Sequence, residues 1–270
     1  MHHVFIRQEQ LSEGGKVLRL RGDDFHHVTH VLRMKEGEEL SASLLYEEGD
    51  SAEEDAPSPV EYRFGIESIA QDHMICRLRF IKEENRELPA KITLLQCLPK
   101  GDKMEGIVQK AVELGAHDVL PVAAKRCVVK LDETKAQAKV RRWQKIAEAA
   151  AMQSKRGIIP EVRQVRGVAE AIASVAEYDL KLIPYELATY EGTGDAEHTS
   201  GMQETRTLMQ RAGEAKHIAV FIGPEGGFEE KEVEQAKDAG FHVITLGKRI
   251  LRTETAGPAV LAWLMFLLES

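Results

Sequence analysis

The chain has 270 residues, of which 43% are hydrophobic and 30% charged, and its formal net charge at pH 7 is −8. This composition supplies a packed interior and excludes a disordered or fibrous protein. A single hydrophobic core rarely grows beyond about 250 residues, so one large or two modest domains are expected. The opening MHHVFIRQEQL lacks the apolar core of a signal peptide, and the most hydrophobic stretch, AVLAWLMFLL, is too short to cross a bilayer. We therefore expect a soluble, cytoplasmic protein.

The first eighty residues have the pattern of a small β domain. Short runs such as HVFI, KVLRL, ELSASLL, VEYRFGIESI and HMICRLRFI alternate with turn signals such as EGG, RGDD and KEGEE. Among them, DDFHHVTHVLRM predicts one or two helical turns capped by Asp23 or Asp24, with Phe25, Val28 and Leu32 on one face. We expect a small barrel or sandwich.

Two features of this region suggest no chemistry of their own. Residues 36 to 61 hold ten carboxylates and no Lys or Arg, and the part from 47 to 58 fits a solvated loop between strands. His26 and His30 stand four apart, as metal ligands on a helix can, but no cysteine or acidic pair accompanies them, so we expect no metal. The polar stretch KEENRELPA, residues 82 to 90, marks a domain boundary.

After this hinge the pattern changes to alternating strands and helices. KITLLQCL, YDLKLIP, HIAVFI and HVITL are apolar throughout, as strands of a parallel sheet covered on both faces are. Helical patterns separate them, including DKMEGIVQKAVELG ended by Gly115, a long helix from about Asp132 to Ser154, GVAEAIASV, ETRTLMQRAG, EEKEVEQAKDAG and a last helix from about Glu254. A polar excursion, YEGTGDAEHTSG, follows YDLKLIP. The second domain is therefore predicted to be α/β.

Charge and cysteine content narrow the class of partner. Residues 97 to 166 hold fifteen Lys or Arg against eight Asp or Glu, so a polyanion could bind there even though the whole chain is acidic. Cys76, Cys97 and Cys127 are an odd number without a CxxC pattern. Buried, reduced thiols are expected rather than disulfides or a zinc site.

Two loops are the candidate ligand-binding site. GPEGG (223 to 227) and GKRILRTETA (247 to 256) follow two successive strands, and ligands of open parallel sheets bind where such loops gather. A phosphate-binding loop would need a pattern such as GxxxxGK[ST] or GxGxxG. Here Glu225 stands within the loop and would repel a phosphate. We therefore disfavour NAD or ATP and expect a neutral or cationic ligand.

The final helix predicts a second copy of the chain. Thr253 and Thr255 are candidates for its N-cap, and Pro258 fits its first turn. Its body, AVLAWLMFLL, is apolar on nearly every face. Such a helix has to be buried in a core or against another subunit, so we favour a homodimer.

Several separated strings together resemble one family. FIGPEGGFEEKEVEQA, HVITLGKRILRTETAGPAVLAW, LPKGDKMEGIVQKAVELGAHDVLPVAAKRC and HHVTHVLRM occur here in the order found in the ribosomal RNA small subunit methyltransferase E family, of the SPOUT superfamily of knotted methyltransferases. The resemblance covers nearly the whole chain. It implies an N-terminal PUA-like β-barrel over 1–82 that binds RNA and an α/β SPOUT domain over 90–270 with a parallel sheet and a deep trefoil knot. It further implies a homodimer that uses S-adenosylmethionine to methylate N3 of a uridine in 16S ribosomal RNA.

The resemblance also assigns the cofactor pocket. Its carried-over positions are Ile222, Gly223, Glu225, Gly226 and Gly227 from the first loop, Leu246, Gly247, Ile250, Leu251, Arg252, Thr253, Thr255 and Ala256 from the second, and Ile183 and Pro184 at a third strand end. The cofactor has a sulfonium and an ammonium but no phosphate, so a carboxylate at Glu225 is compatible with it.

For the reaction, we expect Arg252 to stabilise the negative charge that spreads onto the uracil oxygens. Glu254 or Glu225 would take the N3 proton, and Glu254 could instead only favour its helix N-terminus. For RNA we expect contacts from Arg7, Arg21, Arg33, Lys100, Lys103, Arg126, Gln153 and Arg156.

Two departures and two other functions stay open. Met152 stands where the family usually has a glutamate, and the acidic loop at 47 to 58 replaces a shorter turn. A knotted methyltransferase acting on another nucleotide, such as a ribose 2′-hydroxyl of tRNA, is one alternative. A non-catalytic RNA-binding or ribosome assembly factor is the other. A nucleotide-dependent oxidoreductase lacks its phosphate fingerprint.

Overall fold

The computed structural model describes residues 2–45, 60–83, 86–185 and 195–269, and within 195–200 only the backbone. It divides into two compact units. The first is Met1–Glu87 together with Ala151–Ile159, and the second is Leu88–Ala150 together with Pro160–Ser270. The acidic loop expected at 47 to 58 lies outside the described residues.

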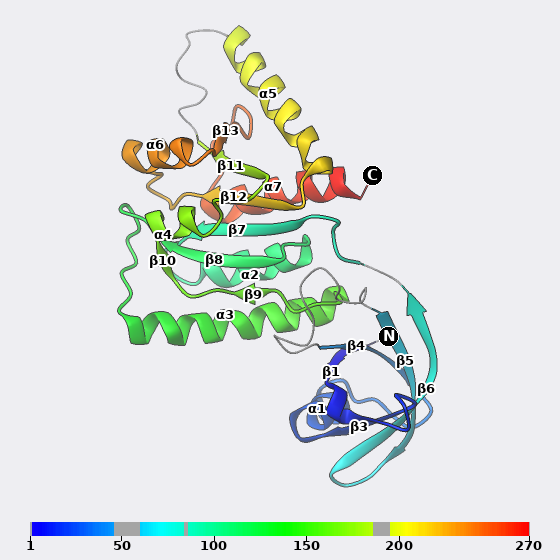
Figure 1. The fold of residues 1–270 in the computed structure, drawn as a ribbon. Helices are drawn as coiled ribbons and strands as arrows, with labels where there is room; N and C mark the ends of the chain where they lie inside the picture. The colour runs from blue at the N-terminus through cyan, green and yellow to red at the C-terminus, as the bar shows by residue number, and fades with distance from the viewer. Residues whose placement is uncertain (1, 46–59, 84–85, 186–194, 270) are drawn as a thin grey trace. The chain divides into compact units, whose positions relative to one another are not determined.

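The first unit is built on one curved sheet of six strands (Figure 1). Its strands are β1 (His2–Ile6), β2 (Leu11–Ser12), β3 (Val17–Arg21), β4 (Glu39–Leu44), β5 (Val60–Ile69) and β6 (His73–Glu83), in the spatial order β1-β4-β5-β6-β3-β2. The pair β1 and β4 is parallel and the other neighbours are antiparallel. Register shifts between β5 and β6 mark bulges, which increase strand twist and bending. The five predicted β runs are all strands.

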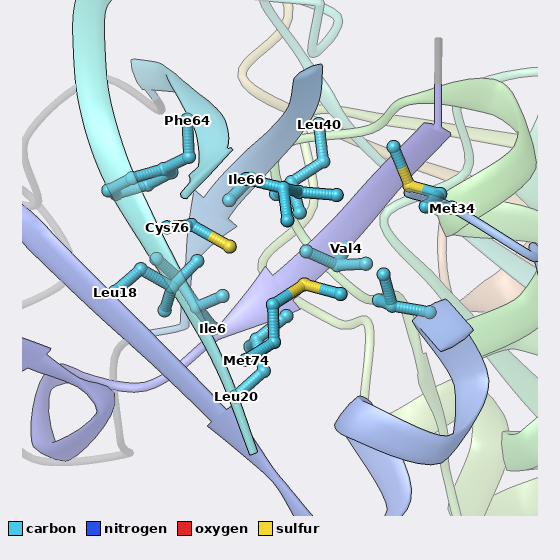
Figure 2. Packing of buried hydrophobic residues seen from close by; sticks show 12 residues of the cluster. Val4, Ile6, Leu18, Leu20, Met34, Leu40, Phe64, Ile66, Met74 and Cys76 are labelled. Carbon is cyan, nitrogen blue, oxygen red and sulfur yellow. The ribbon is translucent and has the colours of Figure 1, made fainter. Parts of the chain in front are cut away.

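One hydrophobic cluster fills the inside of this sheet. Figure 2 shows Ile6 of β1, Leu18 and Leu20 of β3, Phe64 of β5 and Met74 of β6 gathered in this cluster. All five are fully buried. Alternate residues of a strand point to one face, so the period-two pattern of the sequence produces this core directly.

A short helical segment closes one end of the cluster. The predicted turns form as α1 (Gly22–His26) followed by a π-helical turn, η2 (His27–Val31), and Val28 is buried with Phe25 and Leu32 packed beside it. The expected aspartate cap is wrong. Arg21 occupies the N-cap, and Asp23 and Asp24 lie inside the first turn, where carboxylates still favour the helix dipole.

Two buried polar residues of the first unit, Glu61 and His3, have polar partners. Glu61 is 2% exposed and forms ion pairs with Arg63 at 2.7 Å and with Arg86 at 2.9 Å. His3 is also buried, and its Nδ1 lies 2.9 Å from Oγ of Ser41, 38 residues later in the chain. Such pairs oppose the cost of removing charged and polar groups from water.

The second unit is built on a parallel sheet. Its strands are β7 (Lys91–Cys97), β8 (Asp118–Ala123), β9 (Glu161–Val162), β10 (Arg166–Gly167), β11 (Leu180–Pro184), β12 (His217–Ile222) and β13 (His242–Ile244). The spatial order is β10-β8-β7-β12-β11-β13, with β9 beside β8, and every pairing is parallel. Figure 1 shows β7 and β12 side by side within the sheet. Both are buried along nearly their whole length, as their uninterrupted apolar sequences predict.

The helices of this unit are α2 (Lys103–Glu113), α3 (Glu133–Ser154), α4 (Val168–Ala173), α5 (Asp195–Gln210), α6 (Glu230–Asp238) and α7 (Thr253–Leu268), with a 3₁₀ turn, η4 (Arg211–Glu214), after α5. All were predicted, but α5 begins nine residues before ETRTLMQRAG, inside the expected polar excursion. The last four residues of α3 belong to the first unit. α2 packs on α7, and α4 packs on α6. None of the helices in the described ranges combines the length and hydropathy that a membrane span requires.

The start of α7 differs from the prediction. Arg252 is the N-cap residue rather than Thr253 or Thr255, and Pro258 lies inside the helix rather than in its first turn. The side chain of Thr253 is instead used in hydrogen bonds to other elements, described below. The three cysteines are buried and unbridged, as expected.

Candidate functional site

The carboxyl ends of the strands bring the two predicted loops to one edge of the sheet. Ile222 ends β12 directly before GPEGG, and Ile244 ends β13 shortly before GKRILRTETA. β11 lies between these strands, with Pro184 in register with Ile244. Because all three run in the same direction, Ile183, Pro184, Ile222 and both loops share that edge.

Thr253 joins the two loops directly. Its Oγ1 donates to the carbonyl oxygen of Gly223 at 2.7 Å and accepts from Nε2 of Gln96 at 2.9 Å. Gln96 is fully buried near the end of β7 and was missed by the sequence reasoning. The sequence signal that could have found it was a glutamine inside the mainly apolar run KITLLQCL. These bonds fix the beginning of α7 against the ends of β7 and β12.

Glu225 in the first loop is anchored to the segment after β7. Its Oε1 accepts from the backbone N–H of Lys100 and from Nζ of Lys103, both at 3.0 Å. Nζ of Lys103 is also 3.2 Å from Oε2 of Glu254, in the first turn of α7. This second contact is an ion pair outside linear hydrogen-bond geometry, since Oε2 of Glu254 is buried and makes no regular hydrogen bond with the described residues. Lys103 therefore bridges both candidate bases.

Both carboxyl groups are favoured in their ionised form. The pKa of Glu254 is lowered, first by the backbone N–H of Glu254 and then by Lys103 and Arg252. Burial opposes ionisation of Glu225, but backbone N–H groups of Glu225 and Lys100, together with Lys103, lower its pKa overall. The two carboxylates raise the pKa of the Lys103 ammonium, Glu225 more than Glu254.

The segment after β8 also reaches the first loop. Nη1 of Arg126 donates to the carbonyl oxygen of Gly226 at 3.2 Å. Arg126 and Lys103, both predicted to contact RNA, thus have partners within the site. Gln153 is exposed on α3, and Lys100 offers an exposed side chain beside its bonded backbone.

Two glycines give the loops a backbone that other residues rarely adopt. Gly227 has φ of +67° and Gly247 has φ of +103°, and a Cβ at either position would meet no atom within 4 Å. The backbone of both loops is therefore approachable by a ligand. Their neighbours Leu246 and Leu251 are half-buried, and Ile250 is 72% exposed.

The remaining predicted residues divide by exposure. Arg252 and Thr255 are exposed at the start of α7, whereas Ala256 is buried. Of the predicted RNA contacts in the first unit, Arg7, Arg21 and Arg33 are exposed. Arg156 is only 4% exposed and its guanidinium donates to the carboxylate of Glu87. Of the predicted RNA contacts, Arg156 is the one least suited to reach a phosphate.

No set of three or more His, Cys, Asp or Glu side chains that could hold a metal ion is found among the described residues. His26 and His30 stack with ring centroids 4.5 Å apart and an interplanar angle of 9°. Their two rings alone do not make a metal site.

The second unit thus defines an α/β domain with a ligand site at the carboxyl edge of a parallel sheet, and the first unit is a small β domain. Residues 86–265 match the RNA methyltransferase domain family, and residues 16–44 match the RNA methyltransferase PUA domain family. A relative in Bacillus subtilis (strain 168) is named ribosomal RNA small subunit methyltransferase E. It is 34% identical over 257 residues, which is 95% of this chain and 93% of the relative. The chain belongs to this family of ribosomal RNA small subunit methyltransferases E.

Solved structures agree with this assignment. A putative methyltransferase from Legionella pneumophila, described in complex with its bound cofactor SAM, has a TM-score of 0.75 at 31% identity and covers 98% of this chain and 96% of its own. A ribosomal RNA small subunit methyltransferase E from Neisseria gonorrhoeae, bound to S-adenosyl methionine, has a TM-score of 0.74 at 29% identity. It covers 99% of this chain and 98% of its own. The predicted family and the predicted pairing of a PUA-like domain with an α/β methyltransferase domain are confirmed.

Proposed function

We propose that this protein is an S-adenosylmethionine-dependent methyltransferase that methylates N3 of a uridine in 16S ribosomal RNA. Family membership supports the class of reaction, and the relatives' names support the small-subunit RNA substrate. The single observation that supports the chemistry most is the joining of the two loops by Thr253 at the carboxyl edge of the sheet. The proposed division of labour is RNA binding by residues 1–82 and methyl transfer by residues 90–270.

The loop residues fit this cofactor. Two carboxylates and one lysine stand at the edge, so the Lys103, Glu225 and Glu254 cluster has a net negative charge. That charge suits a ligand with a sulfonium and an ammonium and would repel a phosphate. Open space at Gly227 and Gly247 leaves backbone groups for an adenine to bind. When bound, the cofactor supplies an electrophilic methyl group.

The chain's own residues supply the rest of the proposed mechanism. Glu254 or Glu225 would accept the N3 proton of uridine, and the N3 lone pair would take the methyl group as the methyl C–S bond of the sulfonium breaks, with the neutral thioether as the leaving group. The exposed guanidinium of Arg252 stabilises the negative charge that spreads onto the uracil oxygens. A uracil in a stack or pair has to be displaced to expose N3, which requires positioning by surrounding RNA contacts. We assign those contacts to Arg7, Arg21, Arg33, Lys100, Arg126 and Gln153.

The wider context is also part of the proposal. We infer a homodimer that contacts its partner through α7 and acts on ribosomal RNA in the cytoplasm. The apolar composition of α7 and the 72% exposure of Phe266 support the dimer. The trefoil knot expected of the superfamily stays a prediction.

Substitution of Arg252 tests the mechanism. Arg252→Ala is expected to lower kcat about a hundredfold, because charge stabilisation at a reacting anion typically contributes that much. Methyl transfer is measured with labelled cofactor and small-subunit RNA, and N3-methyluridine is identified by mass spectrometry of the nucleosides. Arg249→Ala changes an exposed arginine in the same loop and serves as the matched control.

Three results would change the proposal. Unchanged turnover of Arg252→Ala would remove Arg252 from the mechanism. A different methylated nucleoside would favour the related knotted methyltransferases, and the absence of cofactor binding by calorimetry would favour a non-catalytic assembly factor.

A further inference from the structure

Lys103 is a positively charged residue at the N-terminus of a helix, where such a charge is unfavourable. It is the first residue of α2, where the helix dipole disfavours a positive charge. The compensating negative charge comes from two other segments, Glu225 of the loop after β12 and Glu254 of α7, at 3.0 and 3.2 Å. A lysine that bound RNA phosphate would need an ammonium group turned away from carboxylates, and here it faces two.

The two carboxylates have unequal roles in this contact. Glu225 accepts from both Lys100 and Lys103 at one oxygen, so its position is set twice. Glu254 has the Lys103 ion pair alone among these donors, and its side chain is 27% exposed. The Glu225 side chain is 23% exposed, so exposure does not separate the two carboxylates. Two donors hold Glu225 and one ion pair holds Glu254, so Glu254 is the less constrained carboxylate.

We propose that Lys103 is a positioning residue that orients the Glu254 carboxylate and keeps it ionised as the base, with Glu225 as the fixed counter-charge of the lysine. This inference deepens and rests on the proposed function. It also decides between the two candidate bases left open by the sequence. When Glu254 takes the N3 proton, Lys103 remains paired with Glu225, so no uncompensated cation is left in the site.

The pH behaviour follows from the charges that face Glu254. These are the ammonium of Lys103 from α2, the guanidinium of Arg252, two residues before Glu254 in the chain, and the carboxylate of Glu225, which shares Lys103 with Glu254. Removal of a cation next to a carboxylate raises its pKa. In Lys103→Met the acid limb of the kcat profile is therefore expected to move to higher pH by about one pH unit, because partial exposure keeps the effect at the low end of its range. Lys103→Arg keeps the charge and is expected to keep the limb in place.

A first experiment compares pH–rate profiles and RNA affinity. Lys110→Met, an exposed lysine on the same helix, is the matched control, and thermal unfolding shows that each variant is folded. The proposal expects a displaced acid limb with little change in KM for RNA or in the salt dependence of RNA binding. A raised KM and a reduced salt slope with an unmoved limb would overturn it and restore Lys103 as a phosphate contact.

A second experiment separates this inference from the proposed function. Carboxyl carbons of the glutamates are titrated by NMR in the free protein, without cofactor or RNA, in the wild type and in Lys103→Met. A rise in the Glu254 pKa supports the role of Lys103 even if another nucleoside proves to be the substrate. Unchanged titration of Glu254 overturns the inference even if wild-type methyl transfer to N3 of uridine is observed.

Discussion

At the scale of single residues, His3 is a buried titratable group whose charge state is coupled to folding. Burial, the largest cause, lowers its pKa from 6.5 to about 4, with the cations of Arg86, Lys155 and Arg63 acting in the same direction and Glu61 opposing them. The folded chain therefore holds the ring neutral at pH 7. Its Nδ1 contacts Ser41, and Nε2 has no hydrogen-bond partner among the described residues.

Stability is expected to fall as the pH is lowered through this range. The unfolded chain binds a proton at His3 near pH 6.5 and the folded chain only near 4, so this contribution is complete above pH 6.5 and is lost toward pH 4. The loss is about 3 kcal/mol at most. It is measured as the free energy of unfolding in urea across this range, with His3→Gln expected to flatten the curve. His2→Gln, its exposed neighbour, is the control. Equal slopes in wild type and His3→Gln would contradict the assignment.

At the scale of elements, sequence patterns predicted the type and order of the helices and strands better than their ends. Periodicity depends on which face a residue buries, and the strands β7 and β12 are buried as their sequences require. The position of a helix N-cap depends instead on which group a single side-chain hydroxyl hydrogen-bonds. Thr253 has a good N-cap side chain, but its hydroxyl bonds Gly223 and Gln96, so the cap falls on Arg252. Local propensity could not show these tertiary partners.

The start of α7 gives a prediction at this scale. Thr253→Val keeps the shape of the side chain but removes the hydroxyl that links β7, the first loop and α7. The Gly223 carbonyl oxygen loses this donor, and a buried polar group left unsatisfied costs about 1–3 kcal/mol. Urea unfolding should show this loss, and calorimetry should show weaker binding of S-adenosylmethionine. Thr253→Ser retains the hydroxyl and is expected to remain near wild type. Full cofactor affinity in the valine variant would mean that the link does not shape the site.

At the scale of the whole molecule, the sequence predicted the two loops that make the site but not how their side chains pair. Glycines and a carboxylate mark a ligand loop locally, and parallel strands place such loops at one edge. The pairing of Lys103 with Glu225 joins residues 122 positions apart, and net charge alone made Lys103 resemble an RNA contact. Gln96 was missed for the same reason, because a buried glutamine acquires its role only from the partner that the fold supplies.

The last helix carries the prediction about assembly. Val260, Leu261 and Leu264 are buried within the second unit, while Phe266 on the same helix is 72% exposed. An exposed apolar surface of a helix favours contact with another protein surface, here a second copy. Phe266→Glu is expected to raise the dimer dissociation constant at least tenfold, because a carboxylate would be buried without a partner in the interface. Sedimentation velocity over a concentration series measures this. Val128→Glu introduces the same charge at an exposed apolar residue of the loop after β8 and should leave the dissociation constant unchanged. A wild-type chain that sediments as a monomer throughout, or an unaffected Phe266→Glu dimer, would exclude α7 as the interface.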